Sequence, residues 1–131
     1  MSVSVTITRS IQLPGGVIQS GGVQKTAGQL IQIDENIPQS QTDALIALAL
    51  DVSQIKALFM MCDTAITLET NSSSAPDNTI ALVANVPITW AQGDANACPL
   101  TVDVTALYAT NGAVGSGGSQ LKIIALVDPT V

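Results

Sequence analysis

Apolar and polar residues alternate from the start of the chain. Val3, Val5 and Ile7 are separated by serine and threonine. A period of two places successive side chains on opposite faces of a β-strand, so residues 3–8 are predicted to form one. Short segments rich in β-branched residues recur along the chain and predict further strands at residues 30–33, 55–62, 65–70, 79–83, 87–90, 100–110 and 121–127.

One apolar segment, residues 42–52, fits two structures. Its alanines and leucines favour a helix by intrinsic propensity. Its larger side chains, Ile46, Leu48, Leu50 and Val52, also recur at a period of two, as in a strand. We favour the strand because the surrounding segments have strand patterns, and the helix stays as the alternative.

Turn-forming residues divide these segments. Residues 14–28 contain five glycines and few apolar residues, which indicates a loop or a loosely held N-terminal arm. Residues 111–119 contain four glycines and two serines, which is typical of a flexible loop tip. The short connection at Asp63 and Thr64 predicts that the strands at 55–62 and 65–70 pair as a hairpin.

The spacing of strands and turns predicts the fold class. A chain of 131 residues lies in the size range of a single domain, about 100–150 residues. Short strands separated by turns are typical of an all-β protein. We therefore expect an antiparallel β-sandwich or jelly roll of about eight strands at residues 29–131, preceded by an N-terminal strand and glycine-rich arm at residues 1–28.

The charge of the chain argues against two classes of partner. Ten acidic residues outnumber four basic ones, which gives a net charge of −6, and only 11% of residues are charged. The four basic residues are scattered singly, so no cluster is available to neutralise several phosphates. We expect neither direct nucleic-acid binding nor membrane binding, and the longest apolar run is too short to span a bilayer.

The residues that usually carry catalysis and metal binding are scarce. The chain has no histidine, which excludes Ser-His and Cys-His nucleophiles and removes the commonest zinc ligand. Asp34-Glu35-Asn36 is placed at a strand end, and Asp94-Ala95-Asn96 matches only part of a calcium loop. We therefore expect no enzyme activity, no cofactor and no metal site.

The cysteines and the N-terminus bear on the compartment. The first residues lack the basic and apolar regions of a secretory signal. Cys62 and Cys98 do not have CxxC spacing, and in a protein made in the cytoplasm we expect both to be free thiols. Asn71-Ser72-Ser73 matches a glycosylation sequon, but without a secretory signal it is expected to be a polar loop.

Four residues are candidates for an interface. Val17, Ile18 and Val23 are the apolar side chains of the glycine-rich arm. Trp90 is the last residue of the strand predicted at 87–90 and precedes a polar loop, so it could anchor an interface or pack in the core.

A resemblance adds to this interpretation. The segments ITLETNSSSAP (66–76), IAL (80–82), PITW (87–90), LTVDVTALY (100–108), LKI (121–123) and DPT (128–130) occur in the chain. Their succession, over roughly residues 29–130, resembles small virion proteins of tailed bacteriophages, particularly the decoration (cement) proteins of capsids. The resemblance implies a β-sandwich or jelly roll that binds the major capsid protein, stabilises the shell and forms a homo-oligomer, with a trimer favoured. It implies synthesis in the host cytoplasm and a final location on the virion. It assigns no individual residue.

Two other functions stay open. A tail, baseplate or fibre module that binds a host receptor or carbohydrate would place aromatic and acidic residues together in one groove. An enzyme would place carboxylates with shifted pKa values in a deep pocket.

Overall fold

The structure is a computed structural model that describes residues 2–112 and 119–128. The described residues form ten β-strands, all paired antiparallel, and a single turn of 3-10 helix at Val52–Gln54. The expected all-β, antiparallel sandwich is confirmed. No helix in this part of the chain is long and apolar enough to cross a membrane.

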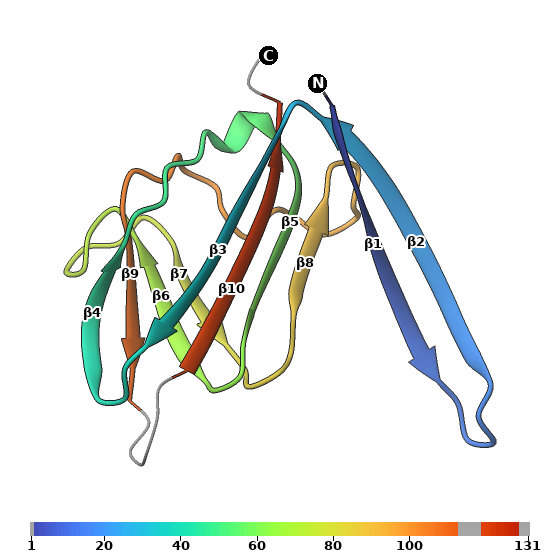
Figure 1. Cartoon of the computed structure of the whole chain (residues 1–131), viewed down its shortest axis with the longest axis horizontal. Helices are drawn as coiled ribbons and strands as arrows, with labels where there is room; N and C mark the ends of the chain where they lie inside the picture. Colours follow the sequence, from blue (N-terminus) through green and yellow to red (C-terminus); the bar gives the residue numbers. More distant parts are fainter. Residues whose placement is uncertain (1, 113–118, 129–131) are drawn as a thin grey trace.

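Eight of the strands form two packed sheets (Figure 1). The first sheet has the order β3-β10-β5-β8, with bounds Gln29–Ile37, Ser119–Val127, Ile55–Cys62 and Ile88–Ala91. The second has the order β4-β9-β6-β7, with bounds Gln41–Ile46, Leu107–Asn111, Ile66–Thr70 and Thr79–Leu82.

The core lies between the two sheets. Leu58, Met60 and Ile123 point inward from the first sheet and meet Leu68 and Leu107 of the second, and all five are buried. Each of these strands alternates, so one face is removed from water and the other stays accessible. Burial of this apolar face is the main force that holds the sandwich together.

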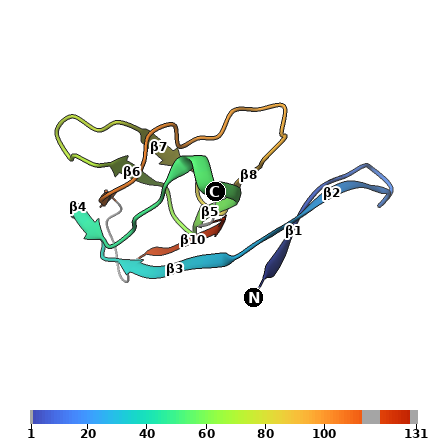
Figure 2. The ribbon, with the colours of Figure 1, turned by 90° about the horizontal axis from the view of Figure 1, so that it is seen from above.

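The two remaining strands form a separate two-stranded sheet, a hairpin whose turn end points away from the sandwich (Figures 1 and 2). β1 (Val3–Gln12) pairs along its whole length with β2 (Ile18–Ala27). The prediction of a loop over residues 14–28 is therefore wrong for 18–27. Alternation in β2 is hidden by Gly21 and Gly22, because a glycine has no side chain that reveals which face it occupies.

The segment at 42–52 is a strand only in its first half. β4 ends at Ile46, and the helix alternative is wrong. Leu48 and Leu50 are buried in irregular backbone that is joined to Val104 by a single bridge, in which each of Leu50 and Val104 donates to the other at 2.9 Å. Every second residue is buried here because the side chains pack into the core, and not because the backbone forms a ladder of strand hydrogen bonds.

The predicted hairpin between residues 55–62 and 65–70 is wrong. β5 belongs to the first sheet and β6 to the second, so the connection at Asp63 and Thr64 passes from one sheet to the other. The Asp63 carboxylate accepts a hydrogen bond from the Gln120 backbone N–H at 2.9 Å, and the Thr64 hydroxyl hydrogen-bonds the Ser119 hydroxyl. Ser119 and Gln120 are the first two residues of β10. Two strands that each bury one face can pack face to face as well as pair edge to edge.

The strand expected at 100–110 forms only from Leu107 onward. Upstream, side-chain amides bind the backbone: Asn78 accepts from the Thr101 N–H at 3.1 Å, and Asn71 accepts from the Thr105 N–H at 2.7 Å. Leu100 and Val104 are buried all the same, whereas Val102 between them is 43% exposed, so burial accounts for only part of the alternating pattern. The tip predicted at 111–119 falls largely at 113–118, outside the described residues.

The structure also gives the positions of the acidic segment and of the two cysteines that were considered in the sequence. Asp34, Glu35 and Asn36 lie inside β3 and not at a strand end, because β3 continues to Ile37. Cys62 is buried, Cys98 is partly buried, and both are free thiols. Burial raises the pKa of the Cys98 thiol.

Candidate interaction site at the hairpin

The turn end of the β1–β2 hairpin exposes several apolar side chains. The turn is closed by the Leu13 N–H, which donates to the Val17 carbonyl at 2.7 Å, and Gly15 and Gly16 both have the positive φ that favours glycine. We call residues 11–18 the hairpin tip. Its exposed apolar side chains are Ile11 (62% exposed), Leu13 (41%), Val17 (55%) and Ile18 (60%).

The base of the hairpin packs on the sandwich. Val3, Val5 and Ile7 lie on one face of β1. Ala27 of β2 is the register partner of Val3, so its side chain lies on the same face of the hairpin. This face meets the outer face of the first sheet in a small apolar cluster whose buried members are Ala27, Ala57 and Leu126, with Leu30 at its margin. The opposite face of the hairpin carries mostly hydroxyl and amide side chains, among them Ser4 and Thr26, which hydrogen-bond each other at 2.7 Å.

Arg9 fixes the hairpin farther from its base. Its guanidinium lies 2.7 Å from Asp94 Oδ2 (Nη2) and 3.3 Å from Oδ1 (Nη1), and it donates to the Thr89 hydroxyl at 3.0 Å and the Thr89 carbonyl at 3.3 Å. Arg9 and Asp94 form the one ion pair found among residues 2–112 and 119–128. The Arg9 hydrogen bonds hold the pKa of Asp94 below its usual range, and the Ala91 N–H adds to this effect.

The Arg9 contacts also cover a sheet edge. Thr89 belongs to β8, which is the outermost strand of the first sheet on the side of the hairpin. An exposed strand edge is open to pairing with other chains, and a charged side chain bound to its backbone blocks that pairing. β8 is therefore protected at Thr89.

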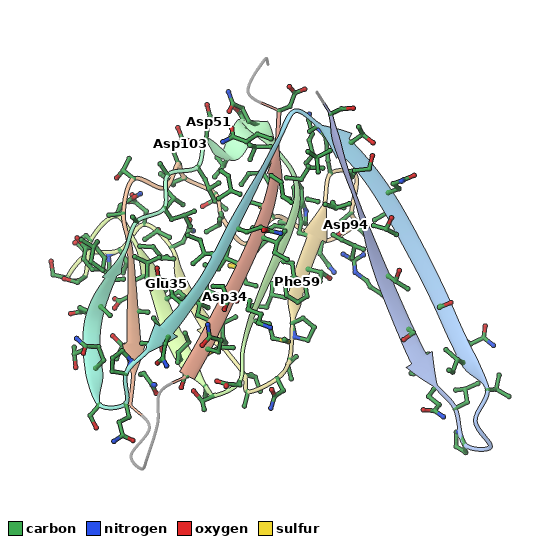
Figure 3. The ribbon with its side chains drawn as sticks, viewed as in Figure 1. Asp34, Glu35, Asp51, Phe59, Asp94 and Asp103 are labelled. Atoms are coloured by element: carbon green, nitrogen blue, oxygen red, sulfur yellow. The ribbon has the colours of Figure 1, made fainter. Side chains whose placement is uncertain are left out.

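Between hairpin and sandwich lies an apolar groove of about 360 Å³. Figure 3 shows the two walls, with Phe59 labelled on β5 and Asp94 near the hairpin. We call this the hairpin groove, and its lining comprises residues 5–8 of β1, residues 57–59 of β5, Pro87 and Thr89, and Ile124 and Leu126 of β10. None of the lining side chains titrates, so the groove offers hydrophobic contact and hydroxyl hydrogen bonds.

The predicted interface residues are placed as follows. Val17 and Ile18 lie together at the tip. Val23 is half-buried in β2, opposite Ile7 on the face turned to the sandwich. Trp90 is half-buried in β8, packs against the core and donates from Nε1 to the Asn96 carbonyl at 3.1 Å. The structure brings the first two together and separates Trp90 from them, and the interface role of all four residues stays a prediction.

Sequence reasoning missed several residues of this site. Ile11 continues the alternation of Val3, Val5 and Ile7, so extending the first strand by four residues would have found it. Phe59 and Ile124 were assigned to strands, but which face of each strand is outward depends on the strand order. The pairing of Arg9 with Asp94, 85 residues apart, has no local signal.

The other candidate polar sites have protein partners. Asp34 accepts from the Gln120 side chain, and Asp94 is paired with Arg9. The described part of the chain contains no group of three or more cysteine, aspartate or glutamate residues placed to hold a metal ion. Comparisons with protein-family models, with curated proteins and with solved structures gave no match.

Proposed function

We propose that the protein is a structural virion protein that binds the outer surface of a capsid and stabilises the shell through its β1–β2 hairpin. The observation that carries this proposal is the hairpin itself, a ribbon with strands of ten residues that ends in four exposed apolar side chains. An isolated two-stranded ribbon is only marginally stable in water, so a surface that covers its tip would be favourable.

A cement function needs binding and no chemistry. A protein that binds only the assembled shell lowers the free energy of that shell relative to its separated subunits. The hairpin groove and tip offer apolar contact, and the surface as a whole has few charges that would lose water on binding. The free edges of the hairpin also offer backbone groups for strand addition.

We also propose that the sandwich is a jelly roll, as expected from the sequence, and the strand order supports this. Strands β3 to β10, taken in chain order, pass from one four-stranded sheet to the other at every step except from β6 to β7, and the sheets are ordered β3-β10-β5-β8 and β4-β9-β6-β7. In this order the first strand lies beside the last, as in a double Greek key, an architecture found in viral capsid and lectin domains. Fold alone does not fix function, so the hairpin remains the main argument.

The proposed partner is the major capsid protein, and the proposed location is the capsid surface. The three aromatic residues do not favour the carbohydrate alternative, because Phe59, Trp90 and Tyr108 lie on β5, β8 and β9 and do not gather in one groove. The hairpin groove contains only Phe59 of the three.

The test is binding to particles. Virions of the virus that encodes the chain should contain it in a fixed ratio to the capsid protein, measured by quantitative mass spectrometry. Particles that lack the chain are then incubated with the full chain, with the tip variant Ile11→Ser/Ile18→Ser, and with Leu45→Ser as a control. Leu45 is 69% exposed on β4, away from the hairpin.

We expect the full chain and the control to bind and to raise the temperature at which the particles release their genome. The tip variant should bind at least about tenfold more weakly, which corresponds to the loss of about 1.4 kcal/mol. Absence of the chain from purified virions would contradict the proposal. Equal binding by the tip variant would remove the role of the hairpin.

A further inference from the structure

We propose that the hairpin groove receives the hairpin tip of a second copy of this chain. The inference deepens the proposed function by naming the neighbour that the hairpin contacts, but it is testable without any particle. Both halves of the contact are present in each copy, as an exposed apolar tip and an open apolar groove.

The tip matches the groove in the distribution of its apolar side chains. The groove has apolar side chains on both walls, with Val5 and Ile7 on the hairpin and Phe59 and Ile124 on the sandwich. An occupant must therefore be apolar on both faces. Ile11 lies opposite Gln19 and Ile18 opposite Gln12, so these two isoleucines project from opposite faces of the ribbon. Nearer the base, one face of the hairpin is mainly hydroxyl and amide and would not fit.

The tip cannot enter the groove of its own chain. The groove is lined by residues 5–8 of β1, whereas the tip begins at residue 11 on the same extended strand. At about 3.3 Å per residue the strand carries the tip away from the groove, and the ribbon does not bend back (Figure 1). The occupant has to come from another molecule.

Charge favours a second copy of this chain as that molecule. Residues 1–28 hold Arg9 and Lys25 and no acid, a net charge of +2. Residues 29–131 hold all ten acids and two lysines, a net charge of −8. Arg9 already pairs with Asp94 of its own chain, so Lys25 is the uncompensated charge of the hairpin, and residues 29–131 keep a net charge of −7. The remaining positive charge still attracts a hairpin to the sandwich of another copy, and two sandwiches repel each other. The tip and the groove lining carry no charged side chain, so their contact buries none.

The contact joins two different surfaces, a tip and a groove. The assembly is therefore closed when every tip lies in a groove and every groove holds a tip. Two copies that exchange tips satisfy this condition, and so does a ring of three, which is the trimer that the resemblance to decoration proteins implies. The measured mass decides the number, and the contact is the same in either case.

The test uses the full chain in solution, studied by sedimentation velocity and light scattering over a range of concentrations. The tip variant is Ile11→Ser/Ile18→Ser. The groove variant is Ile124→Glu, with Phe59→Ser as a second choice if the first does not fold. Val83→Ser is the control, because Val83 is 61% exposed and lies outside both surfaces. Circular dichroism and urea unfolding establish that each variant is folded.

The natural chain and the control should form a defined oligomer, and each variant alone should dissociate at least about tenfold more readily. Mixing the two variants should restore association, because the tip variant keeps an intact groove and the groove variant keeps an intact tip. A natural chain that is monomeric at millimolar concentration would overturn the inference. So would a tip variant that assembles normally, or a mixture that stays monomeric.

The two proposals fail separately. Loss of particle binding with association intact would contradict the capsid function alone. Particle binding by a chain that is monomeric in solution would contradict the tip-and-groove contact alone.

Discussion

The sandwich and the hairpin are built from the same local pattern and differ in what covers them. Both consist of antiparallel strands with alternating apolar residues. In the sandwich, each sheet buries its apolar face on the other sheet, and Leu121 and Ile123 of β10 are buried. In the hairpin, the residues near the base and Arg9 meet the sandwich, and Ile11 and Ile18 stay exposed. A strand pattern therefore determines which face is apolar, and the tertiary partner determines whether that face is covered.

Charge divides the molecule along the same boundary. The hairpin segment carries only positive charge, and the sandwich carries every acid. Such a distribution of charge affects electrostatic steering and solubility more than it affects the fold. Our proposals accordingly assign the contact with other molecules to the hairpin and the role of scaffold to the sandwich.

The largest effect is expected from truncation of a sandwich side chain. Leu121→Ala removes a fully buried side chain from the centre of the core and should lower the free energy of unfolding by about 2–5 kcal/mol. Ile11→Ala at the exposed tip should change it by less than about 0.5 kcal/mol in the monomer. Urea unfolding of both variants checks the contrast. Equal losses would mean that the tip is covered in the free chain.

Removal of the hairpin should have a smaller effect on stability. Deletion of residues 2–28 leaves all eight sandwich strands but exposes Leu126 and Ala57, which the hairpin now covers. Exposure of one leucine corresponds to about 1.5–3 kcal/mol, and we expect the truncated sandwich to lose about that amount. Circular dichroism should still give a strand spectrum with a cooperative melt. A truncated chain that fails to fold would show that hairpin and sandwich are a single cooperative unit.

Buried and exposed polar groups offer a third comparison. Asn111 is fully buried and its side-chain amide donates to the Ile37 carbonyl at 3.0 Å and the Ser119 hydroxyl at 2.8 Å. Asn111→Ala leaves these acceptors without that donor and should lower the free energy of unfolding by about 1–3 kcal/mol. Ser4→Ala, which removes an exposed hydrogen bond on the hairpin, is the matched control and should cost less than about 0.5 kcal/mol. Thermal unfolding measures both, and a larger loss for Ser4→Ala would reverse the comparison.

The sequence predicted the parts of the fold that depend on local pattern. The all-β class and the strands at β5, β6, β7 and β10 follow from alternation and turn residues. The pairing of β5 with β6 was predicted wrongly, because alternation does not distinguish an edge partner from a facing one. The coil around Leu100 and Val104 was predicted as strand because Val102 completes an alternating pattern with them. Val102 is exposed, and the two buried residues lie in irregular backbone held by asparagine side chains.

The candidate site was predicted only in part. Val17 and Ile18 were named as interface candidates, and the structure places both at the exposed tip, while their interface role stays a prediction. The groove could not be predicted, because its walls come from β1, β5 and β10, and their proximity follows from the strand order. The pairing of Arg9 with Asp94 likewise requires the angle between hairpin and sandwich, which depends on the apolar cluster at the base.

The smallest effect concerns how the hairpin is held against the sandwich in acid. Arg9 lowers the pKa of Asp94 in the attached state, with Lys25 contributing a smaller attraction. Since a depressed carboxyl pKa stabilises the state in which it occurs, this contribution is complete above the ordinary aspartate pKa of about 3.9. It is lost as the pH falls through the lower pKa of the attached hairpin.

Ile7 and Arg9 lie on β1 between base and tip and pair with β2. Because an isolated two-stranded ribbon is only marginally stable, detachment should also open this pairing, so amide hydrogen exchange of Ile7 and Arg9 measures how often the hairpin detaches. In the natural chain, protection should be constant around neutral pH, after correction for intrinsic exchange, and should fall only in strong acid. In Asp94→Asn it should be lower at neutral pH and should lack the acid-dependent step, because the asparagine side chain does not titrate. Identical protection in the two proteins at neutral pH would show that the apolar cluster alone holds the hairpin. The ion pair would then serve only to cover the β8 edge at Thr89.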